Sequence, residues 1–175
     1  MLKTFLASFL IAASLVATAI AKEADKKAPA PAAADGAAPA LKLGKFFKGK
    51  AIDKLDPKNV YVIECWATWC GPCKAAIPHV TELAHAYKDV TFIGVAVWEK
   101  GADKEIAAFV KGMGNKMDYN VCRSTKDFEE KWLQANGVKG IPHAFIVKDN
   151  KIVAQVHPGS LEAELEKIGC KKTAK

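Results

Sequence analysis

From Leu41 onward the sequence predicts an α/β domain, because short apolar strands alternate with segments of helical periodicity. Residues 60–65 (VYVIEC) and 91–97 are near-continuous apolar runs of strand length. Each run is followed by apolar residues at helical spacing. The first such segment continues to Tyr87 and the second to Met113. This order of strand, helix, strand and helix is typical of a sheet covered by helices.

The rest of the domain continues the alternation. The further predicted elements are a strand over 119–123, a helix over 128–135, strands over 144–147 and 152–156, and a last helix that ends near Gly169. An Asn-Gly pair at 136–137 is a typical helix stop, and an Asp-Asn pair at 149–150 predicts a tight turn between two strands. Asp103 and Ser160 are placed to cap the helices that follow them.

The N-terminal part of the chain is predicted to lie outside this domain. Lys3, an apolar run over 5–20 and a small-residue cleavage site together predict a secretory signal peptide over 1–21. A retained membrane anchor is the alternative, but the run is shorter than the roughly 20 residues that span a bilayer. Residues 22–40 are rich in Ala, Pro and Lys and predict a flexible linker, which leaves 41–175 as the folded domain.

The charge pattern argues against a nucleic-acid-binding protein. The formal net charge is +7, but the lysines are spread over the linker, the region 42–54 and the C-terminus. A nucleic-acid footprint would gather them on one face or helix. We therefore expect no nucleic-acid partner and a soluble monomer, with weak attraction to anionic membranes or acidic partners as the alternative.

Five cysteines in an exported chain would ordinarily suggest a disulfide framework. Their number is odd, and Cys70 and Cys73 are separated by only two residues, which favours a reactive pair. A thiolate is the nucleophile in disulfide chemistry, and a helix N-terminus favours it through unpaired N–H groups and the helix dipole. The strand over 60–65 leads into a helix that opens with Cys70, and Pro72 fits its first turn.

A lone CxxC motif also occurs in zinc sites. No second CxxC and no paired histidine motif follows in this sequence, so we expect no metal ion.

These residues closely resemble the thioredoxin superfamily. The run over 69–74 (WCGPCK) is the active-site run of that superfamily, Pro78 falls where its first helix is kinked, and the Gly-Ile-Pro run at 140–142 resembles its cis-proline loop. The resemblance implies a thioredoxin-like three-layer α/β/α sandwich with a mixed sheet. The export signal, an inserted helix and strand between Asp103 and Arg123, and the Val-His-Pro run at 156–158 are most similar to the TlpA/ResA branch of bacterial extracytoplasmic proteins.

The resemblance implies a role for each site residue. Cys70, expected at the helix start and open to solvent, would attack a substrate disulfide. Cys73, expected one turn further in and partly covered, would resolve the mixed disulfide, with no cofactor beyond this redox-active pair. The residues implied in substrate binding are Trp69, Gly71, Pro72, Ile141, Pro142 and His143. Two interpretations of His143 are equally supported. The side chain contacts the substrate or helps to hold Cys70 as a thiolate, or it is a variable residue in an exposed loop.

Glu64 precedes Cys70 by six residues, where thioredoxins carry a buried aspartate that exchanges a proton with the second cysteine. The resemblance therefore implies that Glu64 is a base toward Cys73. The alternative is an acid that faces water, but its apolar neighbours favour burial with a raised pKa. ResA-type members also carry a glutamate three residues after the second cysteine; that position is Ala76 here, so the role of that acid does not transfer.

Several other residues receive structural interpretations. Trp66 is expected under the active-site turn and Trp69 over the sulfurs, as in thioredoxins. Cys65 is expected to be a small buried side chain, while Cys122 and Cys170 are expected to be free, with a disulfide between them as the less favoured alternative. The remaining histidines, which have no evident partner in the sequence, are expected to be surface or packing residues: His79, His85 and His157.

The expected activity is reduction of disulfides in exported proteins, in the bacterial periplasm. The Gly-Pro dipeptide between the cysteines matches thioredoxin, whose potential of about −270 mV is that of a reductant. The resemblance implies protein or peptide disulfides as substrates, apocytochromes c among them, and a membrane electron donor of the DsbD or CcdA type. A periplasmic thiol oxidase or isomerase is the first alternative.

Two other classes share this fold. Peroxiredoxins carry a Pro-xxx-Thr-xx-Cys signature, but Ala67 and Ile63 occupy the Thr and Pro positions relative to Cys70. Copper chaperones of the Sco type use CxxxC with a distal histidine, whereas the spacing here is CxxC. The copper chaperone is kept as the non-enzymatic alternative.

Overall fold

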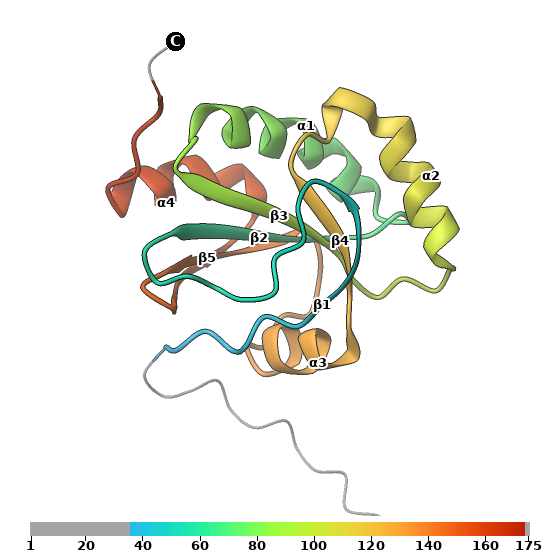
Figure 1. Cartoon of the computed structure of the whole chain (residues 1–175), viewed down its shortest axis with the longest axis horizontal. Coiled ribbons are helices and arrows are strands. Elements are labelled where there is room, and N and C mark those ends of the chain that lie inside the picture. The colour runs from blue at the N-terminus through green and yellow to red at the C-terminus, as the bar shows by residue number, and fades with distance from the viewer. Residues whose placement is uncertain (1–35, 174–175) are drawn as a thin grey trace, which may run out of the picture.

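A six-stranded mixed sheet forms the centre of the computed structural model, which describes residues 36–173 (Figure 1). The strands are β1 (Leu43–Lys48), β2 (Val60–Trp66), β3 (Val90–Ala96), β4 (Asn120–Ser124), β5 (His143–Lys148) and β6 (Lys151–Val156). Their spatial order is β1-β4-β3-β2-β5-β6. Parallel pairing joins β2, β3 and β4, and antiparallel pairing joins β1 to β4, β5 to β2 and β6 to β5.

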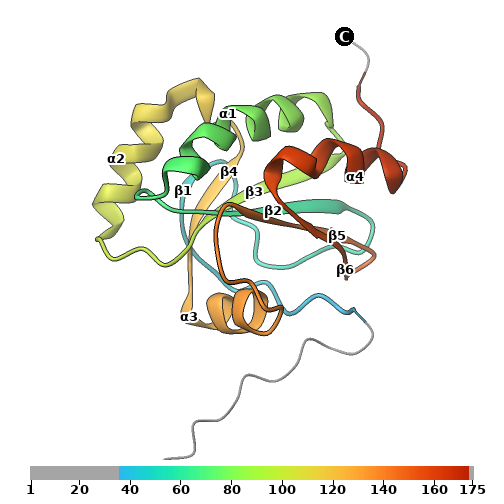
Figure 2. The same ribbon diagram turned by 180° about the vertical axis from the view of Figure 1, so that it is seen from behind.

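Helices cover both faces of the sheet (Figures 1 and 2). One face carries α1 (Gly71–Ala86), α2 (Asp103–Met113) and α4 (Leu161–Lys167); the other carries α3 (Lys126–Phe128), which continues into a π-helical segment (Glu129–Gln134). Short 3₁₀ turns follow α2 (Gly114–Lys116) and precede α4 (Pro158–Ser160). The predicted three-layer α/β/α sandwich with a mixed sheet is confirmed.

Two apolar clusters separate the layers. Under α1, α2 and α4, one cluster includes Trp66, Ile77 and Ile146, and the Trp66 ring stacks on Phe109 at 5.0 Å. Under α3, the other cluster is built around Trp132, whose ring lies 5.6 Å from Phe128 and 5.5 Å from Phe145. Because both faces of β2 and β3 are covered, these strands are apolar along nearly their whole length rather than alternating.

The expected strands and helices are present, with ends shifted by no more than two residues. The helix and strand expected between Asp103 and Arg123 are α2 and β4. The turn between β5 and β6 has positive φ at Asp149 (53°) and Asn150 (57°), as a tight hairpin requires. The expected helix stop is also confirmed, because Gly137 has φ +71°.

The structure adds one strand and corrects two expected helix caps. The sequence did not predict strand β1, because its residues LGKFFK are half-buried at the sheet edge without a clear alternation of apolar and polar side chains. Asp103 is not an N-cap, because Ala102 holds that position and the Asp103 carboxylate accepts from Arg123 Nη1 at 3.0 Å. Ser160 holds the cap position of α4, but its side chain makes no capping hydrogen bond.

The last residues of the predicted linker lie on the sheet. The backbone N–H of Ala38 donates to the Asn150 carbonyl at 2.8 Å, and Ile152 N–H donates to the Gly36 carbonyl at 2.9 Å. This segment therefore pairs with the first residues of β6 and covers the start of an otherwise open strand edge. The predicted signal peptide and the linker up to residue 35 lie outside the described residues.

Within residues 36–173, no helix has both the length and the apolar character that crossing a membrane requires.

Candidate active site

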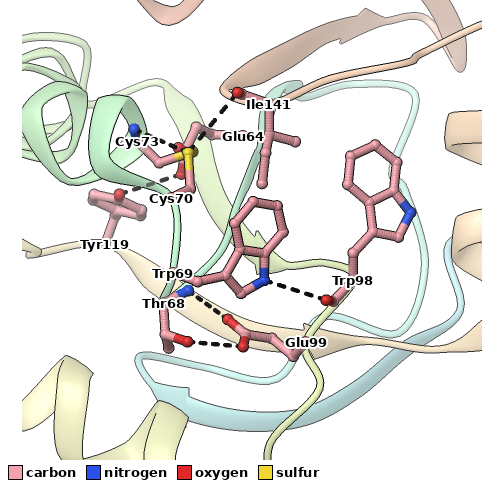
Figure 3. Close-up of a disulfide and its surroundings, with 9 residues drawn as sticks. All are labelled: Glu64, Thr68, Trp69, Cys70, Cys73, Trp98, Glu99, Tyr119 and Ile141. Carbon is pink, nitrogen blue, oxygen red and sulfur yellow. Dashed lines mark hydrogen bonds between the residues drawn. A yellow bond between two sulfur atoms is a disulfide. The ribbon is translucent and has the colours of Figure 1, made fainter.

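The Cys70–Cys73 disulfide lies where β2 leads into α1 (Figure 3). The sulfurs are 2.06 Å apart and the Cα atoms 5.3 Å apart. Cys70 is the N-cap of α1, and its sulfur accepts the backbone N–H of Cys73 at 3.2 Å. Pro72 lies in the first turn, where a missing N–H costs little. The helix start therefore presents an N–H donor to the Cys70 sulfur, which favours the thiolate once the disulfide is reduced.

The two sulfurs differ less in exposure than the sequence suggested. Cys70 was expected to be open to solvent, but only 4% of its surface is exposed, and Cys73 has none. The Ile141 carbonyl oxygen lies 3.8 Å from Cys70 Sγ and helps to cover it. Cys70 is nevertheless the member of the pair that keeps some contact with solvent, as expected.

The predicted cis-proline loop lies beside the disulfide. The Ile141–Pro142 peptide bond is cis, and both residues are half-buried. This loop precedes β5, whereas the disulfide follows β2, and the antiparallel pairing of these two strands brings the loop and the disulfide together. The expected cis-proline is confirmed as a geometric feature.

Trp69 is an exposed aromatic next to the disulfide, with 55% of its surface accessible. Its indole N–H donates to the Trp98 carbonyl at 3.3 Å, and Trp98 itself has a positive φ of 54°. The Glu129 carboxylate accepts the Trp98 backbone N–H at 2.9 Å, so both backbone polar groups of Trp98 are bonded. A left-handed backbone is unfavourable for a bulky residue and persists here because these contacts hold it.

A second contact also joins the residues that follow β2 to the residues that follow β3. Thr68, directly before Trp69, donates its backbone N–H and its hydroxyl to the two carboxylate oxygens of Glu99, at 2.5 and 2.8 Å. A pocket of about 650 Å³, lined mainly by apolar surface, lies between Trp69 and Trp98. Trp69 thus lines an open apolar surface that begins one residue before the disulfide (Figure 3).

His143 is the first residue of β5, and its ring packs edge-on against Phe145, with centroids 4.8 Å apart. Phe145 belongs to the cluster under α3, so the imidazole lies on the sheet face opposite the disulfide. Burial lowers the pKa of His143. Among the described residues, no contact joins it to Cys70, and the geometry supports packing rather than a role at the sulfur.

Glu64 is fully buried, on the sheet face that α1 covers, as the sequence predicted. Burial raises the pKa of Glu64 from 4.5 to about 8, and a hydrogen bond from the Tyr119 hydroxyl to Oε2, at 3.4 Å, partly opposes this effect. The carboxyl is therefore largely neutral at pH 7 and titrates near the range in which a thiol exchanges its proton.

The other cysteines are free. Cys65 and Cys122 are buried, and burial raises the pKa of both thiols, that of Cys122 to about 12. Cys170 is half-buried and free, so the alternative disulfide between Cys122 and Cys170 is absent. Within the described part of the chain, no group of three or more His, Cys, Asp or Glu side chains is placed to hold a metal ion.

Sequence reasoning missed five residues of this site: Thr68, Gly94, Trp98, Glu99 and Tyr119. Trp98 and Glu99 had a usable signal, because residues that follow neighbouring parallel strands meet at the same sheet edge. No sequence signal pointed to Tyr119 or Gly94, because only the folded chain brings them next to Glu64. The sequence indicates no partner for His85, but in the structure its Nε2 lies 2.8 Å from Asp118 Oδ2.

Comparison with known proteins agrees with this geometry. The thioredoxin family model matches residues 45–113. The ResA thiol–disulfide oxidoreductase of Bacillus thuringiensis (strain Al Hakam) is 30% identical over 121 residues, covering 68% of this chain and 67% of that protein. The chain belongs to the thioredoxin family. A second ResA protein of this family, from Bacillus cereus, is 32% identical over 124 residues with the same coverage of both chains.

Solved structures of thioredoxin-family proteins share the fold. A thiol:disulfide interchange protein from Chlorobium tepidum TLS superposes with a TM-score of 0.62 at 21% identity, over 75% of this chain and 94% of that one. With the family assigned and Cys70 and Cys73 bonded at the helix start, this thioredoxin-family chain is a thiol–disulfide oxidoreductase.

The buried Glu64 predicts a pH-dependent stability. Its folded pKa of about 8 lies above the unfolded value of 4.5, so between these values the folded protein retains a proton that the unfolded chain releases. Its contribution to the free energy of unfolding is present below about pH 4.5 and is lost as the pH rises to about 8, by up to about 5 kcal/mol. Glu64→Gln should therefore stabilise the oxidised protein more at pH 8 than at pH 5.

Urea unfolding of the parent and the variant at both pH values measures this difference. An identical effect of the substitution at pH 5 and pH 8 would show that Glu64 does not titrate between them.

Proposed function

We propose that this oxidoreductase reduces disulfide bonds of exported proteins by dithiol exchange, with no cofactor beyond its two active-site cysteines. The observation that carries the proposal is the asymmetry of the pair. Cys70 caps α1 and accepts an N–H of the first turn, while Cys73 is fully buried above the sheet face that holds Glu64. One sulfur is thus placed to attack and the other to act only after a substrate is attached.

The reaction has two steps. The Cys70 thiolate attacks one sulfur of a substrate disulfide, a Cys70–substrate bond forms, and the other substrate sulfur leaves as a thiolate that takes a proton from water. Glu64 then accepts the Cys73 proton, the Cys73 thiolate attacks Cys70 Sγ, and the second substrate thiolate leaves and takes up that proton. Two electrons pass to the substrate, which is released as a dithiol, and the Cys70–Cys73 disulfide is formed.

The surroundings of Cys70 support binding of an extended polypeptide. The Ile141 carbonyl oxygen lies 3.8 Å from Cys70 Sγ and is followed by the cis-Pro142, and the exposed indole of Trp69 lies near the disulfide in Figure 3. Gly71 and Pro72 are exposed at the helix start, next to the small part of Cys70 that reaches solvent. A substrate cysteine that approaches Cys70 would thus meet both a backbone carbonyl and an aromatic surface.

The direction, the donor and the compartment are parts of the same proposal. The Gly-Pro dipeptide favours a reductant, and a reductant that works outside the cytoplasm requires a supply of electrons through the membrane. We therefore include a membrane donor of the DsbD or CcdA type, export to the periplasm through the segment 1–21, and a monomer as the working form.

The order of the two cysteines gives a direct test. Cys73→Ala should keep the attack by Cys70 but remove the resolving thiol, so a substrate stays trapped as a mixed disulfide. Cys70→Ala should remove both attack and trapping. Non-reducing gels after exposure to a model disulfide peptide measure the adducts, and adducts on the Cys70 variant would reverse the assignment.

The direction of the reaction is tested by the redox potential of the Cys70–Cys73 couple. We expect a value nearer to thioredoxin, at about −270 mV, than to the strong oxidant DsbA, at about −120 mV. Equilibration with glutathione buffers, followed by alkylation of free thiols, gives the potential. A value close to that of DsbA would assign an oxidase, and tight copper binding without insulin reduction would assign a metal carrier.

Export predicts a mature protein that begins at or near Lys22, after the small-residue site at Ala21. Mass spectrometry of the protein recovered from an extracytoplasmic fraction tests this expectation. Recovery of a chain that still carries residues 1–21 would instead support a retained anchor.

A further inference from the structure

Tyr119 is a buried polar side chain next to Glu64 that the two reaction steps above leave without a role. Its hydroxyl donates to Glu64 Oε2 at 3.4 Å, although the two residues are 55 positions apart in the sequence. Tyr119 is 8% exposed and Glu64 is not exposed at all. In Figure 3 the tyrosine reaches the carboxyl from the β4 side, while the Cys70–Cys73 disulfide lies at the start of α1.

The sheet provides a specific space for this contact. Gly94 of β3 is the register partner of Glu64 in the parallel pairing of β2 and β3. A Cβ atom at Gly94 would lie 2.8 Å from Tyr119 Cε2 and 3.4 Å from Glu64 Oε2. Since real Cβ atoms do not come so close to an aromatic ring, a side chain at position 94 would displace Tyr119 from the carboxyl.

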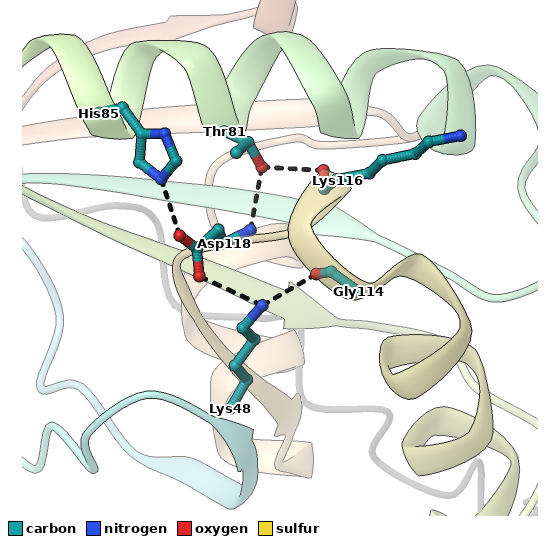
Figure 4. A network of polar contacts seen from close by, with 6 residues as sticks. All are labelled: Lys48, Thr81, His85, Gly114, Lys116 and Asp118. Atoms are coloured by element: carbon teal, nitrogen blue, oxygen red, sulfur yellow. Dashed lines mark hydrogen bonds and ion pairs between the residues drawn. The ribbon is translucent and has the colours of Figure 1, made fainter.

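The segment before Tyr119 is tied to the helix that carries the cysteines (Figure 4). Thr81 of α1 donates its hydroxyl to the Lys116 carbonyl at 2.9 Å and accepts the Asp118 backbone N–H at 3.0 Å. The Asp118 carboxylate also contacts Lys48 Nζ at 3.2 Å and His85 Nε2 at 2.8 Å. The backbone next to Tyr119 is thus held at a fixed position relative to α1.

No described cation balances the carboxyl. The pKa of Glu64 responds to its burial and to Tyr119, and not to any basic group. The titratable groups around it are Cys70 and Cys73 on α1, Tyr119 before β4, and Cys65, which interacts with it from the other side of β2. Burial and the nearby Glu64 raise the pKa of Tyr119 well above 10, so the phenol remains a neutral donor. Donation to a carboxylate favours its charged form.

We propose that Tyr119 is a positioning residue of the resolving step: its hydroxyl orients the Glu64 carboxyl and favours its ionised form, so that it can accept the proton of Cys73. The inference rests on the proposed function, in which Glu64 is the base. Gly94 provides the room for this donor, and Thr81 fixes the segment that carries it.

The test follows the two thiol steps separately in the full chain. Stopped-flow reaction of the reduced protein with 5,5′-dithiobis(2-nitrobenzoate) releases one thiolate when Cys70 attacks, in a step that depends on reagent concentration. The reaction releases a second thiolate when Cys73 attacks the mixed disulfide, and the rate of this step does not depend on reagent concentration. All variants carry Cys170→Ser, because Cys170 is free and half-buried, whereas Cys65 and Cys122 are buried.

Tyr119→Phe keeps the ring and removes only the hydroxyl. The pH midpoint of the second step should rise by about one unit, and below the midpoint this step should be about three- to tenfold slower, because less Glu64 is ionised. The first step should not change. The matched control is Tyr87→Phe, which removes a hydroxyl 3.5 Å from the Glu166 carboxylate in another part of the fold and should move neither step.

The outcomes separate this inference from the proposed function. An unchanged pH profile of the second step in Tyr119→Phe, or equal slowing of both steps at every pH, rejects the role of Tyr119. Glu64→Gln should flatten the profile; if it leaves the profile intact, the base role of Glu64 itself fails. In the parent protein, the ¹³Cζ resonance of Tyr119 should titrate together with the Glu64 carboxyl, and independent titrations would overturn the inference without any variant.

Discussion

The junction between the central strand β2 and helix α1 is the constraint on which the site depends. β2 is held between β3 and β5, so the direction in which it delivers the chain to the helix is fixed by hydrogen bonds on both sides. α1 packs over the same sheet through an apolar stripe that includes Ile77 and Val80. These two attachments set the position of Cys70 at the helix N-terminus, where its sulfur meets an N–H donor rather than open water.

The same junction buries the Glu64 carboxyl, which has an energetic cost and shifts its pKa. Glu64 faces α1 from the middle of β2, and a buried carboxyl without a cationic partner favours its neutral form. The described part of the fold supplies one weak donor, the Tyr119 hydroxyl, and leaves Glu64 Oε1 without a hydrogen-bond partner. The carboxyl is therefore held near its titration point, at a cost in stability that the surrounding apolar packing has to offset.

The walls of the site come from distant parts of the chain. Parallel pairing of β2 and β3 places Trp98 and Glu99 beside Thr68 and Trp69, and antiparallel pairing of β5 places Ile141 over the sulfur. Hydrogen bonds from Thr68 N–H to Glu99 and from the Trp69 indole to the Trp98 carbonyl hold the aromatic surface near Cys70 in place without a ligand. Preformed surfaces of this kind lose less entropy on binding than flexible ones.

The sequence by itself determined the features that depend on neighbours along the chain. The spacing of Cys70 and Cys73, the helix that begins between them, the hairpin at 149–150 and the burial of Glu64 follow from local periodicity and from apolar neighbours. The tertiary structure alone decided what depends on strand pairing. It added β1 at the sheet edge, turned His143 away from the disulfide, and brought Gly94 and Tyr119 to Glu64. No local pattern encodes these contacts, because sheet register, and not sequence separation, determines which side chains meet across a sheet.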